Sequence, residues 1–327
     1  MTILVTGAVG FIGYHVAEAL LARGEHVLGV DNMNAYYDTR LKQARLHRLE
    51  RHPNFNYAFA DIGRAAALGA AIHHHRDRIT GIVHLAAQAG VRHSIDHPTD
   101  YVGPNVSGHL NILELGRHLP NVAHTVYASS SSVYGNSKRV PFAIDDPVDQ
   151  PASLYAATKR ADELMSIAYA QLYRQPLTGL RFFTVIGPWG RPDMAYFRFV
   201  EAILEERKID VFGDGSVTRD FTYVDDIVAG VLAALDRPPA RTEVMPHRLY
   251  NLGSDRPVSL NHLIGLIEEA CGARAVRNVL PPAAGDVPAT WADLSLSRAD
   301  LGYEPATPLD LAIEKFVAWY REYALRN

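Results

Sequence analysis

Three glycines between a strand pattern and a helix pattern constrain the fold of this chain more than any other feature. The apolar run TILVT (2–6) is typical of a strand, and YHVAEALLARG (14–24) is typical of an amphipathic helix that ends at a glycine. Between them, TGAVGFIG carries Gly7, Gly10 and Gly13. The first glycine permits a tight turn, the second lets a pyrophosphate approach the backbone, and the third lets the helix pack close to the strand. This context predicts a dinucleotide phosphate site at the helix N-terminus.

The alternation of strands and helices continues through the first half of the chain. Further strand patterns lie at 26–31, 55–61, 81–87, 124–135 and 177–188. Strands that alternate with helices are joined by right-handed crossovers and form a parallel sheet that is covered on both faces. We therefore expect an α/β fold with a doubly wound parallel (Rossmann) sheet.

The pattern changes after Gly187. It predicts a helix, a segment with the glycine spacing of a hairpin, another helix and a strand that returns to the sheet, at 195–208, 209–226, 226–236 and 248–254. From about Val258 the chain is mostly helical, with a proline-rich interruption at 281–288. A chain of 327 residues is long enough for two domains. We expect a cofactor domain of residues 1–180 plus about 224–256, and a smaller, mainly helical substrate domain of about 181–223 plus 257–327.

The net charge and the cysteine content indicate which kinds of partner and which cellular compartment to expect. A net charge of −4 gives no electrostatic reason to expect a nucleic acid or an anionic membrane as partner. The single cysteine, Cys271, cannot form an intrachain disulfide, which favours a reducing compartment. The start MTILVTG has no basic signal-peptide region and no apolar run is long enough to span a membrane, so we expect a cytoplasmic protein. His73–His75 would face different directions on a helix, so we expect no metal site there.

An acidic residue at the end of the second predicted strand bears on the choice of cofactor. Asp31 follows Gly13 by eighteen residues, where a carboxylate accepts hydrogen bonds from the adenosine ribose and repels a 2′-phosphate. We therefore expect NAD rather than NADP. Asp61 and Ile62 end the third strand, where an adenine ring would lie. The predicted cofactor residues are Gly7, Gly10, Phe11, Ile12, Gly13, Asp31, Asn32, Asp61, Ile62, Leu85, Ala86, Ala87, Gln88, Tyr155 and Lys159.

A tyrosine and a lysine four residues apart follow a serine-rich strand end. Ser129–Ser132 close the fifth predicted strand, at the end where ligands bind in such sheets, and Tyr155 and Lys159 share one face of the next helix. Free tyrosine has a pKa of about 10, too high for a base at neutral pH. A lysine one turn away, with the positive nicotinamide ring nearby, favours the phenolate. We expect Tyr155 to take a hydroxyl proton while the same carbon gives hydride to NAD. Ser130, assisted by Ser132, would hydrogen-bond to that hydroxyl.

These residues resemble those of the short-chain dehydrogenase/reductase superfamily, in particular its extended branch that modifies sugar nucleotides. Four segments carry a closer resemblance: LRFFTVIGPWGRPDMA (180–195), TRDFTYVDDI (218–227), YNLG (250–253) and AGDVPATWADLS (284–295). Together they look like the UDP-glucuronate 4-epimerases, which interconvert UDP-glucuronate and UDP-galacturonate. The family pattern FFTVYGPxGRPDMA is distinctive, and this chain departs from it at Ile186, where tyrosine is usual. The departure removes a hydroxyl near cofactor and substrate but leaves the expected reaction type unchanged.

Several residues in and around these segments are candidates for binding a UDP-sugar. Arg219 suits a diphosphate, because arginine binds such groups with paired hydrogen bonds. Phe212 would stack on uracil, although core packing explains it equally well, and Asp286 would accept from the uridine ribose or orient an arginine. The resemblance places Arg92, Thr184 and Arg191 around the sugar and its carboxylate. Arg191 follows a glycine, however, and an arginine at such a position also suits a surface turn. The predicted substrate residues are Arg92, Ser130, Ser131, Thr184, Arg191, Phe212, Arg219 and Asp286.

The resemblance implies epimerisation through a 4-keto intermediate that rotates and takes the hydride back on its other face. A 4-keto uronate loses its carboxylate most readily when that bond is perpendicular to the carbonyl plane. Thr184, the Ser130–Ser132 hydroxyls and Arg191 are expected to hold the carboxylate away from that angle. Nucleotide-sugar 4,6-dehydratases carry an Asp-Glu pair where this chain has Ser131 and Ser132, which argues against dehydration. A UDP-glucuronate decarboxylase, a UDP-glucose 4-epimerase and a non-catalytic NAD-binding scaffold stay open.

The superfamily also implies an oligomeric state. Its members commonly pair two helices of each subunit in a four-helix bundle. The matching helices here lie near 104–117 and 153–173. We therefore expect a homodimer.

Overall fold

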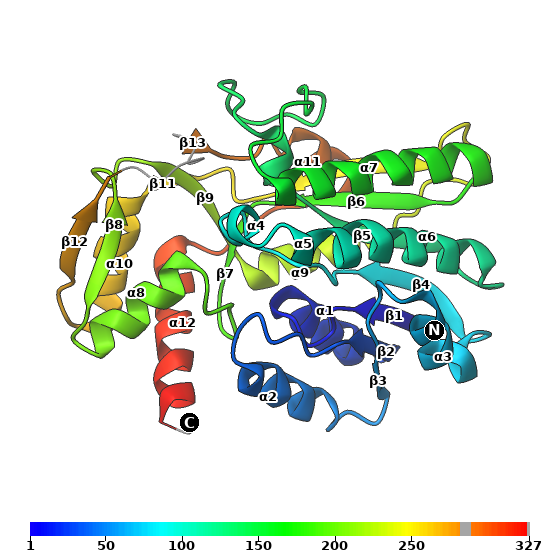
Figure 1. Cartoon of the computed structure of the whole chain (residues 1–327), viewed down its shortest axis with the longest axis horizontal. Helices are drawn as coiled ribbons and strands as arrows, with labels where there is room; N and C mark the ends of the chain where they lie inside the picture. Colours follow the sequence, from blue (N-terminus) through cyan, green and yellow to red (C-terminus); the bar gives the residue numbers. More distant parts are fainter. Residues whose placement is uncertain (282–288, 326–327) are drawn as a thin grey trace.

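The computed structural model describes residues 1–281 and 289–325. Seven strands form its main sheet: β1 (Thr2–Thr6), β2 (His26–Asp31), β3 (Phe55–Phe59), β4 (Ile79–His84), β5 (His124–Ser130), β6 (Leu177–Phe182) and β10 (His247–Leu252). Every pair is parallel, and the order is β10-β6-β5-β4-β1-β2-β3 (Figure 1). The predicted doubly wound sheet is confirmed. The strand order reverses between β1 and β4, beside which ligands of such sheets bind.

Helices cover both faces of this sheet. They are α1 (Phe11–Ala22), α2 (Thr39–Leu49), α3 (Ala65–Ile72), α4 (His93–Asp96), α5 (Thr99–Tyr101), α6 (Gly108–His118), α7 (Leu154–Tyr173) and α9 (Val224–Leu235), with short turns of other helix types at η1 (His73–His75), η2 (Val102–Ser107) and η3 (Ser131–Tyr134). Along β1, Ile3 and Val5 share a core with α1 and α9, whereas Leu4 packs on the other face with α3 and α6. Apolar side chains on both faces are typical of a buried parallel sheet.

The remaining segments form a smaller unit beside the main sheet (Figure 1). Its strands are β7 (Thr184–Ile186), β8 (Lys208–Phe212), β9 (Thr218–Tyr223), β11 (Pro257–Ser259), β12 (Val276–Leu280) and β13 (Ala289–Thr290), and its helices are α8 (Ala195–Leu204), α10 (Leu260–Cys271) and α12 (Leu309–Ala324). The short helix α11 (Ser295–Leu301) instead packs on the main sheet, where the hydroxyl of Ser297 donates to the carbonyl of Asn251 on β10 at 2.6 Å. Aromatic rings join α8 to α12, because Phe316 packs edge-on against Tyr196, with centroids 4.8 Å apart. Such contacts between rings hold elements together beyond their buried area.

The predicted hairpin at 209–226 is wrong. β8 pairs with β12, whereas β9 pairs with β7, β11 and β13. The turn between them does carry Gly213 and Gly215 at positive φ, as hairpin turns do. However, Asn261 of α10 anchors this turn: its backbone N–H donates to the carbonyl of Gly215, and its side-chain amide donates to the carbonyl of Asp214. The turn is therefore held against a helix, and the two strands find other partners.

The apolar run 177–188 is divided between two sheets. β6 stays in the main sheet, while β7 pairs with β9, with Thr184 opposite Phe221 and Ile186 opposite Tyr223. Ile186 is fully buried in the core. Of the proline-rich interruption, residues 282–288 lie outside the described ranges. Among the helices that are described, none is long and apolar enough to cross a membrane.

Candidate active site

The carboxyl ends of three neighbouring strands bring the predicted cofactor and catalytic segments together. β5, β4 and β1 are adjacent in the sheet. The glycine turn follows β1, residues 85–88 follow β4, and Ser130–Ser132 close β5 and form the start of η3. Because the carboxyl ends of parallel strands lie at one edge of a sheet, these three segments meet there.

The glycine turn has a shape that only glycine permits. Gly7 has a φ of +70°, and a Cβ built on it would lie 2.7 Å from the backbone nitrogen of Ala86. A Cβ on Gly13 would lie 2.0 Å from the carbonyl oxygen of Gly7, so a side chain there would force α1 away from β1. Gly10 caps α1 without a side-chain hydrogen bond, and the first turn holds no acidic residue. The N–H groups of that turn, in Phe11, Ile12 and Gly13, therefore suit an anionic phosphate.

Asp31 closes β2 with its carboxylate at the same edge. The carboxylate accepts a hydrogen bond from the backbone N–H of Met33 at 2.8 Å and lies 3.9 Å from the ammonium of Lys42. Asp61 follows β3, which lies two strands from β1 in the sheet. Its carboxylate accepts a hydrogen bond from the N–H of Gly63 at 2.8 Å, and the neighbouring Ile62 is buried. Asn32 follows Asp31, and its side chain accepts a hydrogen bond from the N–H of Asn34.

Asn105, which was not predicted as a site residue, fixes the segment after β4. Its Oδ1 accepts from the backbone N–H of Gln88 at 2.8 Å, and its Nδ2 donates to the carbonyl of Gln88 at 3.0 Å. The same amide donates to Thr158 Oγ1, which lies on α7 beside Lys159. This buried side chain therefore links residues 85–88 to α7. No local pattern marks Asn105, because its partners are 17 and 53 residues away.

The serines and the lysine at the end of β5 lie close together. Ser132 Oγ donates to Ser130 Oγ at 2.9 Å. The ammonium of Lys159 is buried and donates to the carbonyl of Ala128, two residues before Ser130, at 3.0 Å. Tyr155 is half-buried in the first turn of α7. A hydroxyl pair, a phenol and an ammonium thus stand around the same strand end.

Three polar residues around Tyr155 and the predicted Arg191 were not predicted themselves: Tyr101, Asp193 and Tyr36. The ring of Tyr101 lies edge-on to Tyr155 with centroids 6.1 Å apart. Arg191, which is close enough to Tyr155 to interact with it electrostatically, forms a paired contact with Asp193 at 3.0 and 2.8 Å. The hydroxyl of Tyr36 donates a hydrogen bond to Oδ2 of the same Asp193 at 3.3 Å. Burial acts to lower the pKa of Arg191, but Asp193 outweighs it and raises that pKa. The guanidinium therefore stays charged.

The remaining predicted substrate residues come from both parts of the molecule. The guanidinium of Arg92 lies over the ring of Phe212, 4.4 Å from its centroid, and joins the start of α4 to β8. Thr184 begins β7, directly after the stretch of β6 that pairs with Ser130. Arg219 lies in β9, and its Nη1 donates to the carbonyl of Thr218. Asp286 lies outside the described residues.

Arg45 connects the glycine turn to the loop that precedes Arg191. It is fully buried, and its guanidinium donates to the carbonyl of Val9 at 2.9 Å and to the carbonyl of Trp189 at 2.5 Å. Its other partners are the hydroxyl of Tyr37 and the carbonyl of Gly190. One buried side chain therefore fixes the cofactor side of the site relative to the substrate side.

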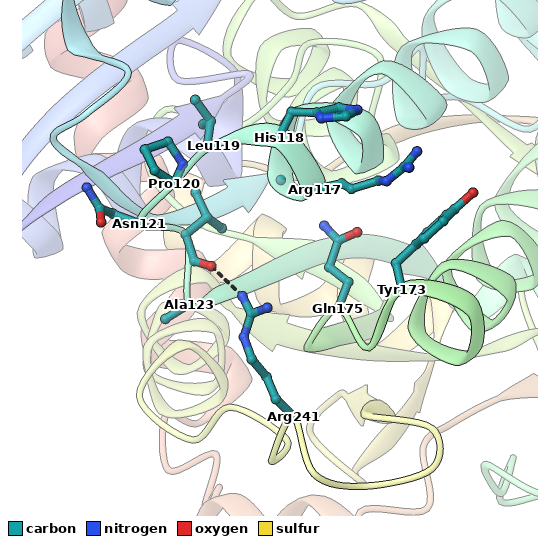
Figure 2. A pocket seen from close by; sticks show the side chains of 11 residues that line it. Arg117, His118, Leu119, Pro120, Asn121, Ala123, Tyr173, Gln175 and Arg241 are labelled. Carbon is teal, nitrogen blue, oxygen red and sulfur yellow. Dashed lines mark hydrogen bonds between the residues drawn. The ribbon is translucent and has the colours of Figure 1, made fainter.

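Figure 2 shows a pocket of about 580 Å³ that contains none of the predicted site residues. It is lined by residues 116–123 with Tyr173, Gln175 and Arg241, and Arg241 donates to the carbonyl of Val122 at 2.8 Å. These residues directly precede β5, β6 and β10 in the chain, so the pocket lies at the amino ends of the strands, opposite the glycine turn. Doubly wound sheets bind ligands at the other edge, so this pocket is not the candidate active site.

The fold and the strand-end site define an enzyme of the short-chain dehydrogenase type, with a tyrosine and a lysine beside a dinucleotide turn. Comparison with known proteins narrows this class. The chain belongs to the NAD dependent epimerase/dehydratase family, which it matches over residues 3–253.

Three similar proteins have names that specify a reaction. UDP-glucuronate 4-epimerase 4 of Arabidopsis thaliana is 46% identical, over 99% of this chain and 76% of that protein. A probable UDP-glucuronate 4-epimerase of Rhizobium meliloti (strain 1021) is 43% identical, over 98% of this chain and 97% of its own length. The crystal structure of the UDP-glucuronic acid 4-epimerase of Bacillus cereus, in complex with UDP-glucuronic acid and NAD, aligns with a TM-score of 0.89 at 33% identity. That alignment covers 99% of this chain and 100% of that one.

Proposed function

We propose that this chain is an NAD-dependent UDP-glucuronate 4-epimerase, which interconverts UDP-glucuronate and UDP-galacturonate. The observation that carries this function is near full-length similarity, at 46% and 43% identity, to two proteins named for that reaction. The site supports it, because Tyr155, Lys159 and the Ser130–Ser132 hydroxyls stand at the edge where the glycine turn lies.

The residues that would hold NAD form a continuous edge of the sheet. The glycine turn and the first turn of α1 would bind the pyrophosphate, Asp31 the adenosine ribose, and Asp61 and Ile62 the adenine. Bound NAD would supply the hydride chemistry, in which a hydride leaves C4 of the sugar and later returns to it. We assign this role to residues 1–180 plus about 224–256, and the binding of UDP-sugar to about 181–223 plus 257–327.

The side chains of this protein carry the proton and orient the sugar. Tyr155 takes the proton of the C4 hydroxyl as that carbon is oxidised, and gives it back when the ketone is reduced on its other face. Lys159 favours the phenolate by its charge. Ser130, with Ser132 bonded to it, holds the reacting oxygen. Between the two half-reactions the 4-keto sugar rotates about its bond to the diphosphate.

The substrate residues fall into two groups by the part of the substrate that they would bind, the UDP moiety or the sugar carboxylate. Arg219 suits the diphosphate, and Phe212 suits the uracil once the guanidinium of Arg92 leaves its ring. Thr184, Ser131 and Arg191 suit the sugar carboxylate. Asp286 would accept from the uridine ribose or orient an arginine. Arg191 would need to bind this carboxylate in addition to Asp193, or in exchange for it.

Proton NMR of the purified protein with UDP-glucuronate and NAD tests this function, with the anomeric signals and released carbon dioxide followed together. We expect UDP-galacturonate to grow without carbon dioxide. UDP-pentose with carbon dioxide would instead identify a decarboxylase. If UDP-glucuronate is not converted but UDP-glucose is, the chain is a UDP-glucose 4-epimerase, and Ile186 is the first residue whose substitution should be tested.

The variant Tyr155→Phe separates an enzyme from a binding scaffold. We expect turnover to fall by about 10³-fold or more, because the phenol carries the proton. The amount of NAD that copurifies with the protein should not change, since the pyrophosphate site does not involve this hydroxyl. Turnover equal to that of the native chain would exclude the assigned base.

We also propose that the chain forms a homodimer through α6 and α7. Apolar side chains stand exposed on these helices, with Leu110 40% exposed, Leu164 52% and Leu172 70%. Exposed leucines on two neighbouring helices are typical of a helix–helix interface between subunits.

A further inference from the structure

We propose that Asp162 is a positioning residue for the epimerisation, which holds the ammonium of Lys159 and limits how much of its positive charge acts on Tyr155. This inference rests on the proposed function. Asp162 belongs to neither the glycine turn nor the Ser-Tyr-Lys set, and no feature of the sequence alone pointed to it.

The contact between Asp162 and Lys159 is short and buried. Asp162 Oδ2 lies 3.1 Å from Lys159 Nζ, and their side chains are 0% and 3% exposed. The two residues lie three apart on α7, on the face that packs against β5. Lys159 gives a second donor to the carbonyl of Ala128. Two of the three donors of the ammonium are thereby used, so its position is fixed before a ligand binds.

Asp162 is not satisfied as a structural ion pair would be. Its second oxygen, Oδ1, is buried and has no hydrogen-bond partner in the part of the chain that the structure describes. A half-satisfied buried carboxylate costs folding free energy, because desolvation is not fully offset. Stability alone therefore gives no reason for a carboxylate at this position, whereas control of the charge on Lys159 does.

The neighbouring acid of the same helix cannot replace it. Glu163 Oε1 accepts from Arg181 at 2.8 Å and from Ser129 at 2.6 Å, and Oε2 accepts from Arg160 at 2.9 Å. Although burial acts to raise the pKa of Glu163, Arg181 outweighs it and lowers that pKa. Glu163 is therefore an anion whose charge is taken up by two arginines.

The groups that face Asp162 and Lys159 from other elements are neutral. Burial lowers the pKa of His84 on β4 to about 3, and burial likewise lowers the pKa of His109 on α6 far below its usual value. Burial raises the pKa of Tyr127 on β5 well above 10. Near pH 7 these three groups carry no charge, so the charge on Asp162 opposes that of Lys159 without competition from them.

The ionisation of Asp162 gives this effect a pH window. Burial raises the pKa of Asp162 to about 6, although Lys159 acts in the opposite direction. Above that pH the carboxylate is charged and partly neutralises the ammonium of Lys159. Below that pH the carboxyl group is protonated and neutral, so it no longer opposes the charge of the ammonium. Arg191 also acts on Tyr155, from the substrate side of the site, but its charge is constant across this range.

The variant Asp162→Asn tests the proposal, because it keeps the shape and one oxygen acceptor but removes the charge. Seven helical residues separate Asp162 from Tyr155 by about 10 Å along the axis. A unit charge at that distance shifts a titration by about one pH unit at an effective dielectric constant of about 20. We expect the acidic limb of kcat/KM against pH to move about one unit toward lower pH. The profiles of variant and native enzyme should converge well above this limb and again below pH 6, where native Asp162 carries its own proton.

A control variant and a second measurement separate this effect from a structural one. Glu114→Gln removes the same charge from α6, where Glu114 pairs with Arg117 and Tyr169, and should leave the acidic limb in place. Carbon-13 NMR of tyrosine labelled at Cζ, with the Tyr155 signal assigned by Tyr155→Phe, should show the same shift without cofactor or substrate. If Asp162→Asn does not fold, Asp162→Ser carries the same expectation.

The outcomes distinguish this inference from the proposed function. Superimposable pH profiles and tyrosine titrations, in a folded variant that retains NAD, would overturn the role of Asp162 and leave the epimerase intact. Failure of the native chain to epimerise UDP-glucuronate would instead overturn the proposed function. The tyrosine titration would then still report on the effect of Asp162 on Tyr155.

Discussion

Thr184 is the residue at which epimerisation and decarboxylation would be separated. It begins β7, next to the end of β6, and its backbone is fixed by pairing with Phe221. A hydroxyl at this point would hold the sugar carboxylate close to the plane of the C4 ketone. The carboxylate then cannot align its bond to C5 with the π system of the carbonyl.

For Thr184→Ala we therefore expect a larger share of UDP-pentose among the products. Loss of one hydrogen bond to the carboxylate costs about 1 kcal/mol, which corresponds to about a fivefold change in partition. The ratio of UDP-pentose to UDP-galacturonate, measured by NMR at equal substrate conversion, checks this. Thr184→Ser is the matched control, because it retains the hydroxyl and should keep the native ratio. An unchanged ratio in the alanine variant would remove Thr184 from the carboxylate site.

At the scale of single elements, the start of α7 determines where Tyr155 stands. Ser153 caps this helix, and its Oγ accepts from the N–H of Ala156 at 3.1 Å. Tyr155 lies between these two residues, in the first turn. First turns fray most easily, so the cap fixes the phenol as well as the helix.

We expect Ser153→Ala to lower the free energy of unfolding by about 1 kcal/mol and to lower kcat as well. Ser259→Ala is the matched control. Ser259 caps α10 in the same way, with its Oγ accepting from the N–H of His262 at 3.1 Å, but α10 carries no predicted site residue. Urea unfolding and steady-state kinetics of both variants decide the matter. Equal loss of kcat in the two variants would mean that stability alone, not the position of Tyr155, is responsible.

The elements also show which parts of the site the sequence could predict. Gly7, Asp31 and Ser130 were placed correctly at one edge, because strand and helix periods fix which end of each strand faces the ligand. Asp162 was not recognised, because its role depends on burial against β5 and on a lysine that shares its face. The predicted pairing of β8 with β9 was wrong for a similar reason. The actual partner of β8 is β12, which begins at Val276, and no local sequence pattern predicts a contact that distant.

At the scale of the whole molecule, the exposed leucines of α7 bear on assembly. For Leu164→Glu combined with Leu172→Glu, we expect a monomer in sedimentation-velocity experiments where the native chain sediments as a dimer. Charges placed in an apolar interface would have to be desolvated, which prevents association. Val279→Glu is the control, since Val279 is also 67% exposed but lies on β12, away from α6 and α7. A native chain that sediments as a monomer, or a double variant that stays dimeric, would contradict the proposed interface.

Buried histidines limit the folding stability of the whole molecule in mild acid. His84, His109, His124 and His247 lie on four different elements of the main sheet and its helices, and all are buried. Burial lowers the pKa of His84 to about 3 and those of His124 and His247 to about 4, from an ordinary value of 6.5. In the unfolded chain these rings bind protons near pH 6.5, whereas in the folded chain they do not. The stability that neutral histidines provide is therefore complete above pH 6.5 and is lost as the pH falls toward 4.

Asp162 acts in the opposite direction, because its raised pKa of about 6 lets the folded state bind a proton first. One carboxylate does not offset four histidines, each of which costs up to about 1.4 kcal/mol per pH unit below its unfolded pKa. We expect the melting temperature to fall steeply between pH 6.5 and 4, measured by scanning calorimetry. His124→Gln should make this fall shallower, because an amide can still bond Thr178 and Leu235 but takes up no proton. His26→Gln, at an exposed position, should leave the slope unchanged. A melting temperature that stays constant down to pH 4 would mean that these rings are already protonated in the folded chain.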